Sequence, residues 1–251
     1  MTGWLRVVGL GPGPAQWLTP EASAVLAEAS DLVGYHSYLA RLTPRADQRV
    51  HGSDNGDELA RAREALALVE QGARVALVSG GDPGVFAMAA ALFEAIEQGA
   101  PALRALDVAV LPGVTAMLAA AARLGAPLGN DFCAINLSDN LKPWAVIERR
   151  LRAAAQADFV IALYNPASRA RPEQIERAFA LLRTLRAPET PVMLAQAVGR
   201  DGEALHVTQL GTVEAALCDM RTLVLIGASS TRVLERPGRT SWVYTPRRLS
   251  S

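Results

Sequence analysis

Two glycine-rich turns hold the residue types best suited to ligand binding. The first, Gly9-Leu10-Gly11-Pro12-Gly13, follows an apolar run that is typical of a first strand. The second, Ser79-Gly80-Gly81-Asp82-Pro83-Gly84-Val85-Phe86, also follows a strand-like run and precedes a helical pattern. Open α/β sheets bind ligands at the edge where parallel strands end. We therefore expect the two turns to lie at one ligand-binding edge.

The first turn differs from a dinucleotide-binding fingerprint. That motif has a third glycine where this chain has Pro14, and Pro12 and Pro14 remove two backbone donors from a would-be pyrophosphate site. The acid expected about 20 residues later is Asp31, which stands before the second strand instead of at its end. A nicotinamide oxidoreductase is therefore disfavoured. A stiff turn with little side-chain bulk suits the wall of a cleft for a bulky, flat ligand.

Asp82, in the second turn, has two interpretations. It either accepts hydrogen bonds from a ligand that the glycines admit close to the backbone, or it caps the next helix with Pro83 at the first helical position. The sequence leaves both interpretations open.

Three motifs together resemble the tetrapyrrole (corrin and porphyrin) methyltransferases. They are the first glycine turn, the Gly-Gly-Asp-Pro loop with its following aromatic residue, and Pro112-Gly113-Val114-Thr115-Ala116. Further segments resemble the precorrin-3B C17-methyltransferases within that family: residues 34–39, 138–144, 163–166 and 199–203. Asn140-Leu141-Lys142 departs from the subfamily pattern.

The resemblance implies a reaction and a fold. The reaction is S-adenosylmethionine-dependent methylation of precorrin-3B at C17, with ring contraction to precorrin-4, in cobalamin biosynthesis. The fold is α/β, with a mostly parallel N-terminal domain (1–112), a mixed-sheet C-terminal domain (113–251) and the active-site cleft between them. A cytoplasmic homodimer is expected. Alternatives are a related tetrapyrrole methyltransferase (another ring carbon or a cobalt-precorrin substrate), an RNA or protein methyltransferase of the same fold, and a non-catalytic binding module.

The resemblance also assigns cofactor contacts to motif positions. Residues of the first domain should border the ribose and methionine, Thr115 and Ala116 the methionine or sulfonium, and residues of the second domain the adenine. The expected contacts are Gly11, Pro12, Gly81, Asp82, Val85, Phe86, Thr115, Ala116, Tyr164, Asn165, Ala197, Val198 and Thr222.

Methyl transfer needs mainly alignment, because a sulfonium is already a strong electrophile. Ring contraction also needs groups that move protons. The candidates are Tyr35, His36, Tyr38 and Asp139. Because the substrate's rim carries carboxylates, arginines near loops are candidate ligands for them: Arg41, Arg45, Arg149, Arg169 and Arg200.

Composition excludes several classes of protein. The 25 Lys and Arg residues balance the 25 Asp and Glu residues, which argues against a nucleic-acid partner. Cys133 and Cys218 lack the spacing of a disulfide scaffold or zinc site, and the three histidines are widely separated, so no metal is expected. Half of the chain is hydrophobic, with no membrane-length apolar run and no signal-peptide pattern, which favours a cytoplasmic globular protein.

The elements that position these residues alternate between strand and helix, as in α/β proteins. In the first half the pattern predicts strands at 4–10, 31–35, 73–79 and 106–111. It predicts helices at 20–29, with Thr19 as N-cap, at 58–71 and from the second glycine turn to about 98, and a polar loop at 51–57. The second half adds helices at 114–124, 143–156 and 172–186, and strands at 132–138, 158–164, 191–198, 203–210 and 222–228. The Asp-Gly turn at 201–202 predicts an antiparallel pair, and therefore a mixed second sheet.

Overall fold

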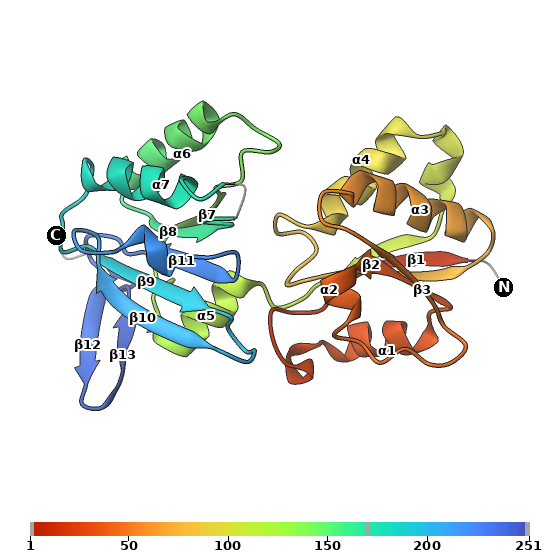
Figure 1. The fold of residues 1–251 in the computed structure, drawn as a ribbon, viewed down its shortest axis with the longest axis horizontal. Coiled ribbons are helices and arrows are strands. Elements are labelled where there is room, and N and C mark those ends of the chain that lie inside the picture. The colour runs from red at the N-terminus through yellow and green to blue at the C-terminus, as the bar shows by residue number, and fades with distance from the viewer. Residues whose placement is uncertain (1–2, 169–170, 249–251) are drawn as a thin grey trace. The chain divides into compact units, whose positions relative to one another are not determined.

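The computed structural model describes residues 3–168 and 171–248. The chain divides into two compact units, Met1–Thr115 (unit 1) and Ala116–Ser251 (unit 2). Each unit is built around a sheet of its own with helices packed on it, as Figure 1 shows.

The sheet of unit 1 is fully parallel, with strand order β3-β2-β4-β1-β5. Its strands are β1 (Trp4–Gly9), β2 (Asp31–Tyr35), β3 (Arg49–Ser53), β4 (Arg74–Ser79) and β5 (Val108–Leu111). Its helices are α1 (Pro20–Glu28), α2 (His36–Leu39), α3 (Glu58–Glu70) and α4 (Met88–Gln98), with short 3-10 turns η1 (Ala15–Trp17) and η2 (Pro101–Ala105). Because every strand points the same way, the segments that follow the strands all emerge at one edge.

Alternation of apolar side chains along the strands fixes which helices cover each face. Val8 and Val78 face α1, whereas Val7 and Leu77 face α3 and α4, so the sheet is covered on both sides (Figure 1). The connections from β1 to β2 and from β4 to β5 run in opposite directions along the sheet. The neighbouring strands β1 and β4 therefore form a topological switch point, where α/β sheets bind ligands.

The sequence pattern predicted most of unit 1, was wrong about residues 51–53, and left two interpretations of Asp82 open, of which the structure excludes the helix cap. Thr19 caps α1 as expected, its Oγ1 accepting a hydrogen bond from the backbone N of Ala22 at 3.1 Å. The predicted polar loop at 51–57 overlaps an edge strand, β3, whose exposed residues lack an apolar alternation. Helix α4 begins at Met88, so Asp82 does not cap it and Pro83 is not at its first position.

The main sheet of unit 2 is mixed, as predicted, with strand order β10-β9-β11-β8-β7. Its strands are β7 (Phe132–Asn136), β8 (Val160–Tyr164), β9 (Pro191–Gln196), β10 (Ala204–Gln209) and β11 (Thr222–Ile226). Strands β7 and β8 are parallel, and the remaining pairs are antiparallel. Helices α6 (Trp144–Gln156) and α7 (Gln174–Arg183) bury Ile147, Leu151 and Phe179 against this sheet.

A second, small sheet in unit 2 was not predicted. It consists of β6 (Gly125–Ala126), which follows α5 (Ala116–Leu124), and the hairpin β12 (Arg232–Arg236) and β13 (Arg239–Tyr244). The short turn η3 (Ala215–Leu217) precedes β11. The arginine-rich sequence of the hairpin has few buried side chains, so its hydrophobic pattern is weak.

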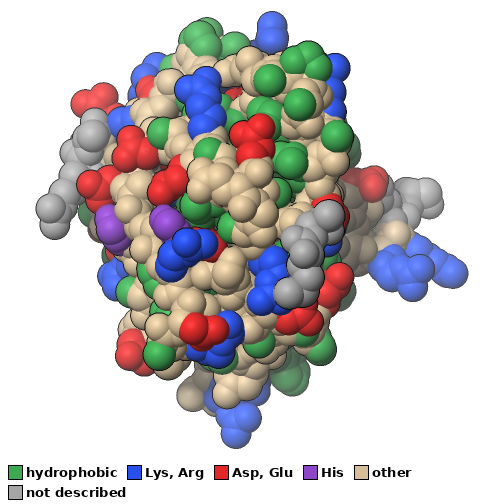
Figure 2. Space-filling view, turned by 90° about the vertical axis from the view of Figure 1, so that its right-hand side faces the viewer, with side chains coloured by type: hydrophobic (Ala, Val, Ile, Leu, Met, Phe, Trp, Pro, Cys, Tyr) green, Lys and Arg blue, Asp and Glu red, His purple; other side chains and the backbone are tan. Residues whose placement is uncertain are grey.

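Cationic and anionic side chains are interspersed on the face that Figure 2 presents, as expected for a chain with balanced charge. Among the described residues no helix is long and apolar enough to span a membrane. No cluster of three or more His, Cys, Asp or Glu side chains that could hold a metal ion was found among them.

Candidate active site

The loops after β1, β4 and β5 meet at a glycine junction, formed by Gly9, Gly11, Gly81 and Gly113. Gly11 and Gly81 exchange two backbone hydrogen bonds, each 3.1 Å long. A Cβ atom on Gly9 would lie 2.7 Å from the Gly113 nitrogen and 2.9 Å from the Gly81 oxygen. At Gly9 and Gly113 a side chain is therefore excluded by neighbouring main chain, whereas Gly11 and Gly81 have positive φ angles of 65° and 67°, which glycine adopts without strain.

Asp82 ties two of these loops together. Its Oδ1 accepts a hydrogen bond from the Gly84 nitrogen at 2.8 Å, and its Oδ2 accepts one from the Gly113 nitrogen at 3.0 Å. The carboxylate is half-buried and forms no salt bridge to a described residue. Each oxygen retains a lone pair, so Asp82 can accept ribose hydroxyls or face a positive charge.

The backbone beside Asp82 forms a cradle that fits a nucleoside cofactor. Gly81 has a φ of 67°, and a Cβ atom there would have no neighbour closer than the Thr115 Cα and Val114 O at 3.9 Å. Phe86 has a φ of 54°, which L residues rarely adopt, and the residue is 47% exposed. Open space, an acid and an exposed aromatic side chain suit the ribose and the sulfonium of such a cofactor.

The other residues of unit 1 that are predicted to contact the cofactor differ in how deeply they are buried. Gly11 and Pro12 are buried in the first turn, Val85 is half-buried and Thr115 is 6% exposed. Backbone atoms are therefore the main groups that the first turn can present.

Two tyrosines and a histidine follow β2 at the same edge. The rings of Tyr35 and Tyr38 pack edge to face, with centroids 5.4 Å apart. A Cβ atom on Gly80 would lie 2.6 Å from the Tyr38 ring, so this ring lies directly against the second glycine loop. His36 packs in the same way against Gly52 at the end of β3. The structure thus places Tyr38 against the second glycine loop, Tyr35 against Tyr38, and His36 against the neighbouring strand β3.

The predicted carboxylate-binding arginines have varied surroundings. An Nη atom of Arg41 donates to the carbonyls of Leu10 and Gly13 at 3.0 and 2.9 Å, which holds the first turn in place. Arg45 is paired with Asp47, its Nε lying 3.0 Å from the carboxylate. Arg149 and Arg200 are exposed in unit 2, and Arg169 lies outside the described residues.

In unit 2, the predicted contacts lie at strand ends and are held by side-chain hydrogen bonds. The Tyr164 hydroxyl accepts from the Met117 nitrogen at 3.1 Å, in the first turn of α5, which starts at Ala116. The Asn165 amide donates to Asn136 Oδ1 at 3.0 Å. The Thr222 hydroxyl donates to Asp219 Oδ1 at 2.8 Å.

Backbone strain marks three of the predicted contact positions. Phe86, Asn165 and Ala197 have φ values of 54°, 51° and 48°, and Asp158 is the remaining described non-glycine residue with positive φ. Non-glycine residues in this region are uncommon and cluster at functional sites. Sequence gives no sign of such strain. Val198, next to Ala197, is buried.

Asp139 belongs to a polar cluster that sequence analysis did not foresee. Gln174 Nε2 donates to Asp139 Oδ2 at 3.1 Å, and Arg171 Nη1 lies 3.5 Å from Oδ1. Partial burial acts to raise the pKa of Asp139, but the hydrogen bond from Gln174 and the charge of Arg171 outweigh it and lower the pKa. The carboxylate therefore stays ionised near neutral pH.

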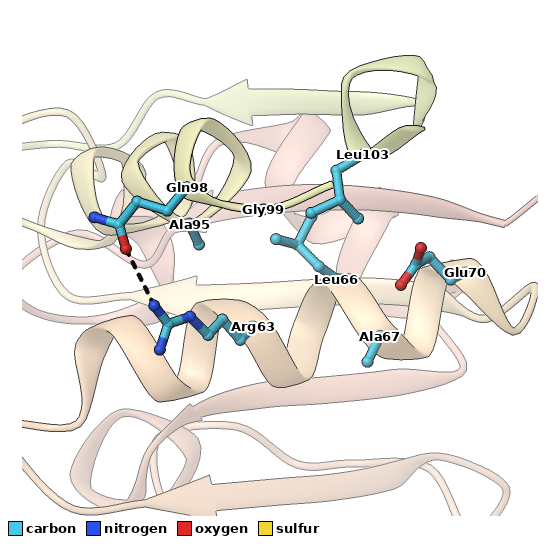
Figure 3. A pocket seen from close by; sticks show the side chains of 8 residues that line it. All are labelled: Arg63, Leu66, Ala67, Glu70, Ala95, Gln98, Gly99 and Leu103. Atoms are coloured by element: carbon cyan, nitrogen blue, oxygen red, sulfur yellow. Dashed lines mark hydrogen bonds between the residues drawn. The ribbon is translucent and has the colours of Figure 1, made fainter. Parts of the chain in front are cut away.

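A hollow elsewhere in unit 1 is separate from these residues. It has a volume of about 160 Å³ and lies between the C-terminal halves of α3 and α4, where Arg63 donates to Gln98 across its rim at 3.1 Å (Figure 3). Because α4 starts after the second glycine loop, its C-terminal half lies towards the opposite edge of the sheet.

The family model of the Tetrapyrrole (Corrin/Porphyrin) Methylases matches residues 5–214, and the chain belongs to this family. Methylases of this family take the methyl group from S-adenosylmethionine.

Three individual proteins of known name are similar to this chain. The chain is 55% identical, over 98% of its length and 97% of the relative's, to a precorrin-3B C(17)-methyltransferase from a Sinorhizobium species. It superposes on the crystal structure of the methyltransferase CobJ with a TM-score of 0.93, at 51% identity, covering 97% of this chain and 100% of that one. A uroporphyrin-III C-methyltransferase from Thermus thermophilus, solved with S-adenosylhomocysteine, shares the fold (TM-score 0.68, 23% identity, 90% and 97% coverage).

Proposed function

We propose that this enzyme methylates precorrin-3B at C17 with S-adenosylmethionine and promotes the ring contraction that yields precorrin-4, in cobalamin biosynthesis. The observation that supports this most directly is the 55% identity, across 98% of the chain, to a relative named for that reaction. The cradle at the carboxyl edge of unit 1 is consistent with the cofactor.

The bound cofactor supplies an electrophilic methyl group, and the residues of the chain orient it. Asp82 is proposed to accept hydrogen bonds from the ribose, with Gly11, Pro12, Gly81, Val85 and Phe86 lining the same stretch. Thr115 and Ala116 are proposed to border the methionine portion. Tyr164, Asn165, Ala197, Val198 and Thr222 are proposed to hold the adenine. The positive φ angles of Phe86, Asn165 and Ala197 support these assignments.

Ring contraction requires proton movement, for which Tyr35, His36 and Tyr38 are the favoured candidates. Tyr38 lies against Gly80, which follows β4, His36 lies against Gly52 near the end of β3, and the ring of Tyr35 packs on that of Tyr38. Asp139 remains a prediction for proton transfer, but its lowered pKa makes it a poor proton donor.

The enzyme is further proposed to act in the cytoplasm as a homodimer and without nucleic acid. The resemblance to its family supports the dimer, and the balance of 25 cations and 25 anions argues against RNA.

One incubation tests the proposed function. The protein is mixed with methyl-labelled S-adenosylmethionine and either precorrin-3B or its cobalt-containing counterpart, and products are followed by mass and absorbance. We expect one labelled methyl group on precorrin-3B and the spectrum of a contracted ring. Preferential turnover of the cobalt-containing compound would show that it, and not precorrin-3B, is the substrate. Absence of methylation of both compounds would overturn the proposal.

Single variants then test the proton-transfer residues. Tyr35→Phe, His36→Ala and Tyr38→Phe are assayed separately for methylation and contraction. Methylation without contraction in one variant identifies a participant, whereas unchanged product in all three removes these residues from the mechanism.

A further inference from the structure

A polar cluster in unit 2 lies where the parallel strands β7 and β8 end. Because Asn136 pairs with Tyr164 in register, the segments after these strands leave the sheet side by side. They are joined by the hydrogen bond from Asn165 to Asn136 and by one from the Leu137 nitrogen to the Tyr164 oxygen at 3.0 Å. This edge is the type of place where α/β sheets bind ligands.

Two cations converge on Ser138 in this cluster. Arg171 Nη1 donates to Ser138 Oγ at 2.8 Å, and Lys142 Nζ donates to the Ser138 carbonyl oxygen at 3.4 Å. Lys142 is the single lysine of the chain. Both side chains are partly buried, with that of Arg171 20% exposed, so the two charges are held close together instead of extending into solvent.

The cations retain hydrogen-bond donors. Among the described residues Arg171 donates from its side chain through Nη1 alone, and Lys142 has one acceptor. An arginine has five side-chain N–H donors and a lysine three, so Nε and Nη2 of Arg171 and two ammonium protons are available. The cluster can therefore donate to a further acceptor.

The charges of the cluster favour an anion. Lys142 and Arg171 face one acid, Asp139, and Arg150 adds another positive charge nearby. Burial and then the charge of Arg150 lower the pKa of Lys142, although Asp139 acts in the opposite direction. A bound carboxylate would neutralise the excess positive charge and accept hydrogen bonds from both cations.

We propose that Lys142 and Arg171 form a subsite that binds a peripheral carboxylate of the macrocyclic substrate, and that Asp139 and Gln174 position Arg171. This inference rests on the proposed function for the identity of the ligand. Gln174 is 7% exposed and donates a hydrogen bond to Asp139, which in turn lies beside Arg171. The contacts therefore run from buried Gln174 through Asp139 to Arg171, which would contact the ligand. Asp139 is thereby a positioning residue.

The test measures discrimination between two unreactive corrins by isothermal titration. Cobyrinic acid has carboxylic acid side chains, and in cobinamide these are amides. Wild-type protein should bind cobyrinic acid more tightly. Lys142→Met and Arg171→Met should each weaken cobyrinic acid binding about tenfold, the effect of one charged hydrogen bond, and leave cobinamide binding unchanged. Lys142→Arg should restore most of the affinity.

Controls separate this subsite from the cofactor, from net charge and from folding. Arg63→Met removes an exposed charge of α3 and should leave corrin binding unchanged. Variants are compared by thermal melts, and Asp139→Asn should weaken cobyrinic acid binding less than Arg171→Met does. Unchanged discrimination in the Lys142 and Arg171 variants, or an equal loss of S-adenosylhomocysteine affinity, would overturn the proposal. Because no turnover is measured, its failure is distinct from failure of the methylation assay.

Discussion

The carboxyl edges of the two sheets are built differently. In unit 1, main-chain atoms of three loops touch at Gly9, Gly81 and Gly113, and few side chains intervene. In unit 2, side chains at the strand ends form hydrogen bonds: Asn165 to the end of β7, Tyr164 to the start of α5, and Thr222 to the turn before β11. The first edge requires residues without side chains, whereas the second requires particular polar groups.

The largest expected effect comes from a methyl group added to the glycine junction. In Gly113→Ala the Cβ atom would lie 2.9 Å from the Gly9 Cα and closer still to the Gly81 oxygen. Because backbone must move to admit it, we expect a loss of about 3 kcal/mol in the free energy of unfolding and no detectable S-adenosylhomocysteine binding. Urea unfolding and calorimetry measure both. The Cβ atom of Gly84→Ala would have the Asp82 carboxylate as its nearest contact, at 3.2 Å, so this variant should lose much less stability and binding. Equal losses in the two variants would contradict the claim that close main-chain packing at the glycine junction holds the loops.

Removing the buried Arg186 side chain tests whether the stability of unit 2 depends on polar groups as strongly as unit 1 depends on its glycine junction. Arg186 is 5% exposed and donates to the carbonyls of Ala154 and Phe159 at 3.2 and 2.7 Å, near the end of α6. Arg186→Met removes the donor to the Phe159 carbonyl and one of the two donors to the Ala154 carbonyl, which also accepts from the Phe159 nitrogen at 3.1 Å. This loss should cost about 2–3 kcal/mol in urea unfolding. The exposed Arg152→Met on the same helix should cost under about 0.5 kcal/mol. A difference between them near zero would show that α6 does not need Arg186.

The opposite edge of unit 1 should show a pH dependence. Asp31 is fully buried at the start of β2 and accepts from Arg49 and Ser30 at 2.8 and 2.7 Å, with His51 also at 2.8 Å. Burial acts to raise its pKa, but these hydrogen bonds outweigh burial and hold the pKa below 3.8. The stabilisation is therefore complete above about pH 5, one unit above the unfolded-state pKa, and is lost as pH falls through the lower folded-state pKa.

The Asp31→Asn variant tests this assignment. We expect about 2 kcal/mol lower stability than wild type at pH 7, and a smaller difference at pH 3. Asp107→Asn, which removes an exposed pair with Arg6, is the control and should change stability little at either pH. A constant difference for Asp31→Asn across this range would refute the assignment.

The smallest expected effect is a gain in stability. Ala197 has a φ of 48°, which a glycine adopts without strain, so Ala197→Gly should raise the free energy of unfolding by up to about 1 kcal/mol. Ala195→Gly, in the regular strand β9, should lower it by about 1 kcal/mol. Losses of the same size in both variants would show that the backbone at 197 is not strained.

The difference between the two sheet edges also explains which features could be predicted from the sequence. Buried strands such as Trp4–Gly9 and Val160–Tyr164 have apolar runs of strand length, and the glycine junction appears in sequence as glycine motifs. The edge strand Arg49–Ser53 and the hairpin at 232–244 lack that pattern, because their pairing depends on neighbouring strands. Strain at Asn165 is set by tertiary packing and leaves no mark in composition. The cluster of Arg171 and Lys142 joins residues far apart in the chain.

At the carboxyl edge of unit 1, the groups that shape the backbone are largely different from the side chains that could contact a ligand. At the edge of unit 1 the path of the chain is set by glycines together with hydrogen bonds from Asp82 and Arg41, while partly or largely exposed side chains such as Tyr35 and Phe86 project from it. Exchanging those projecting groups should therefore retune ligand preference without remodelling the scaffold, which makes this edge a suitable starting point for engineering new macrocycle selectivity.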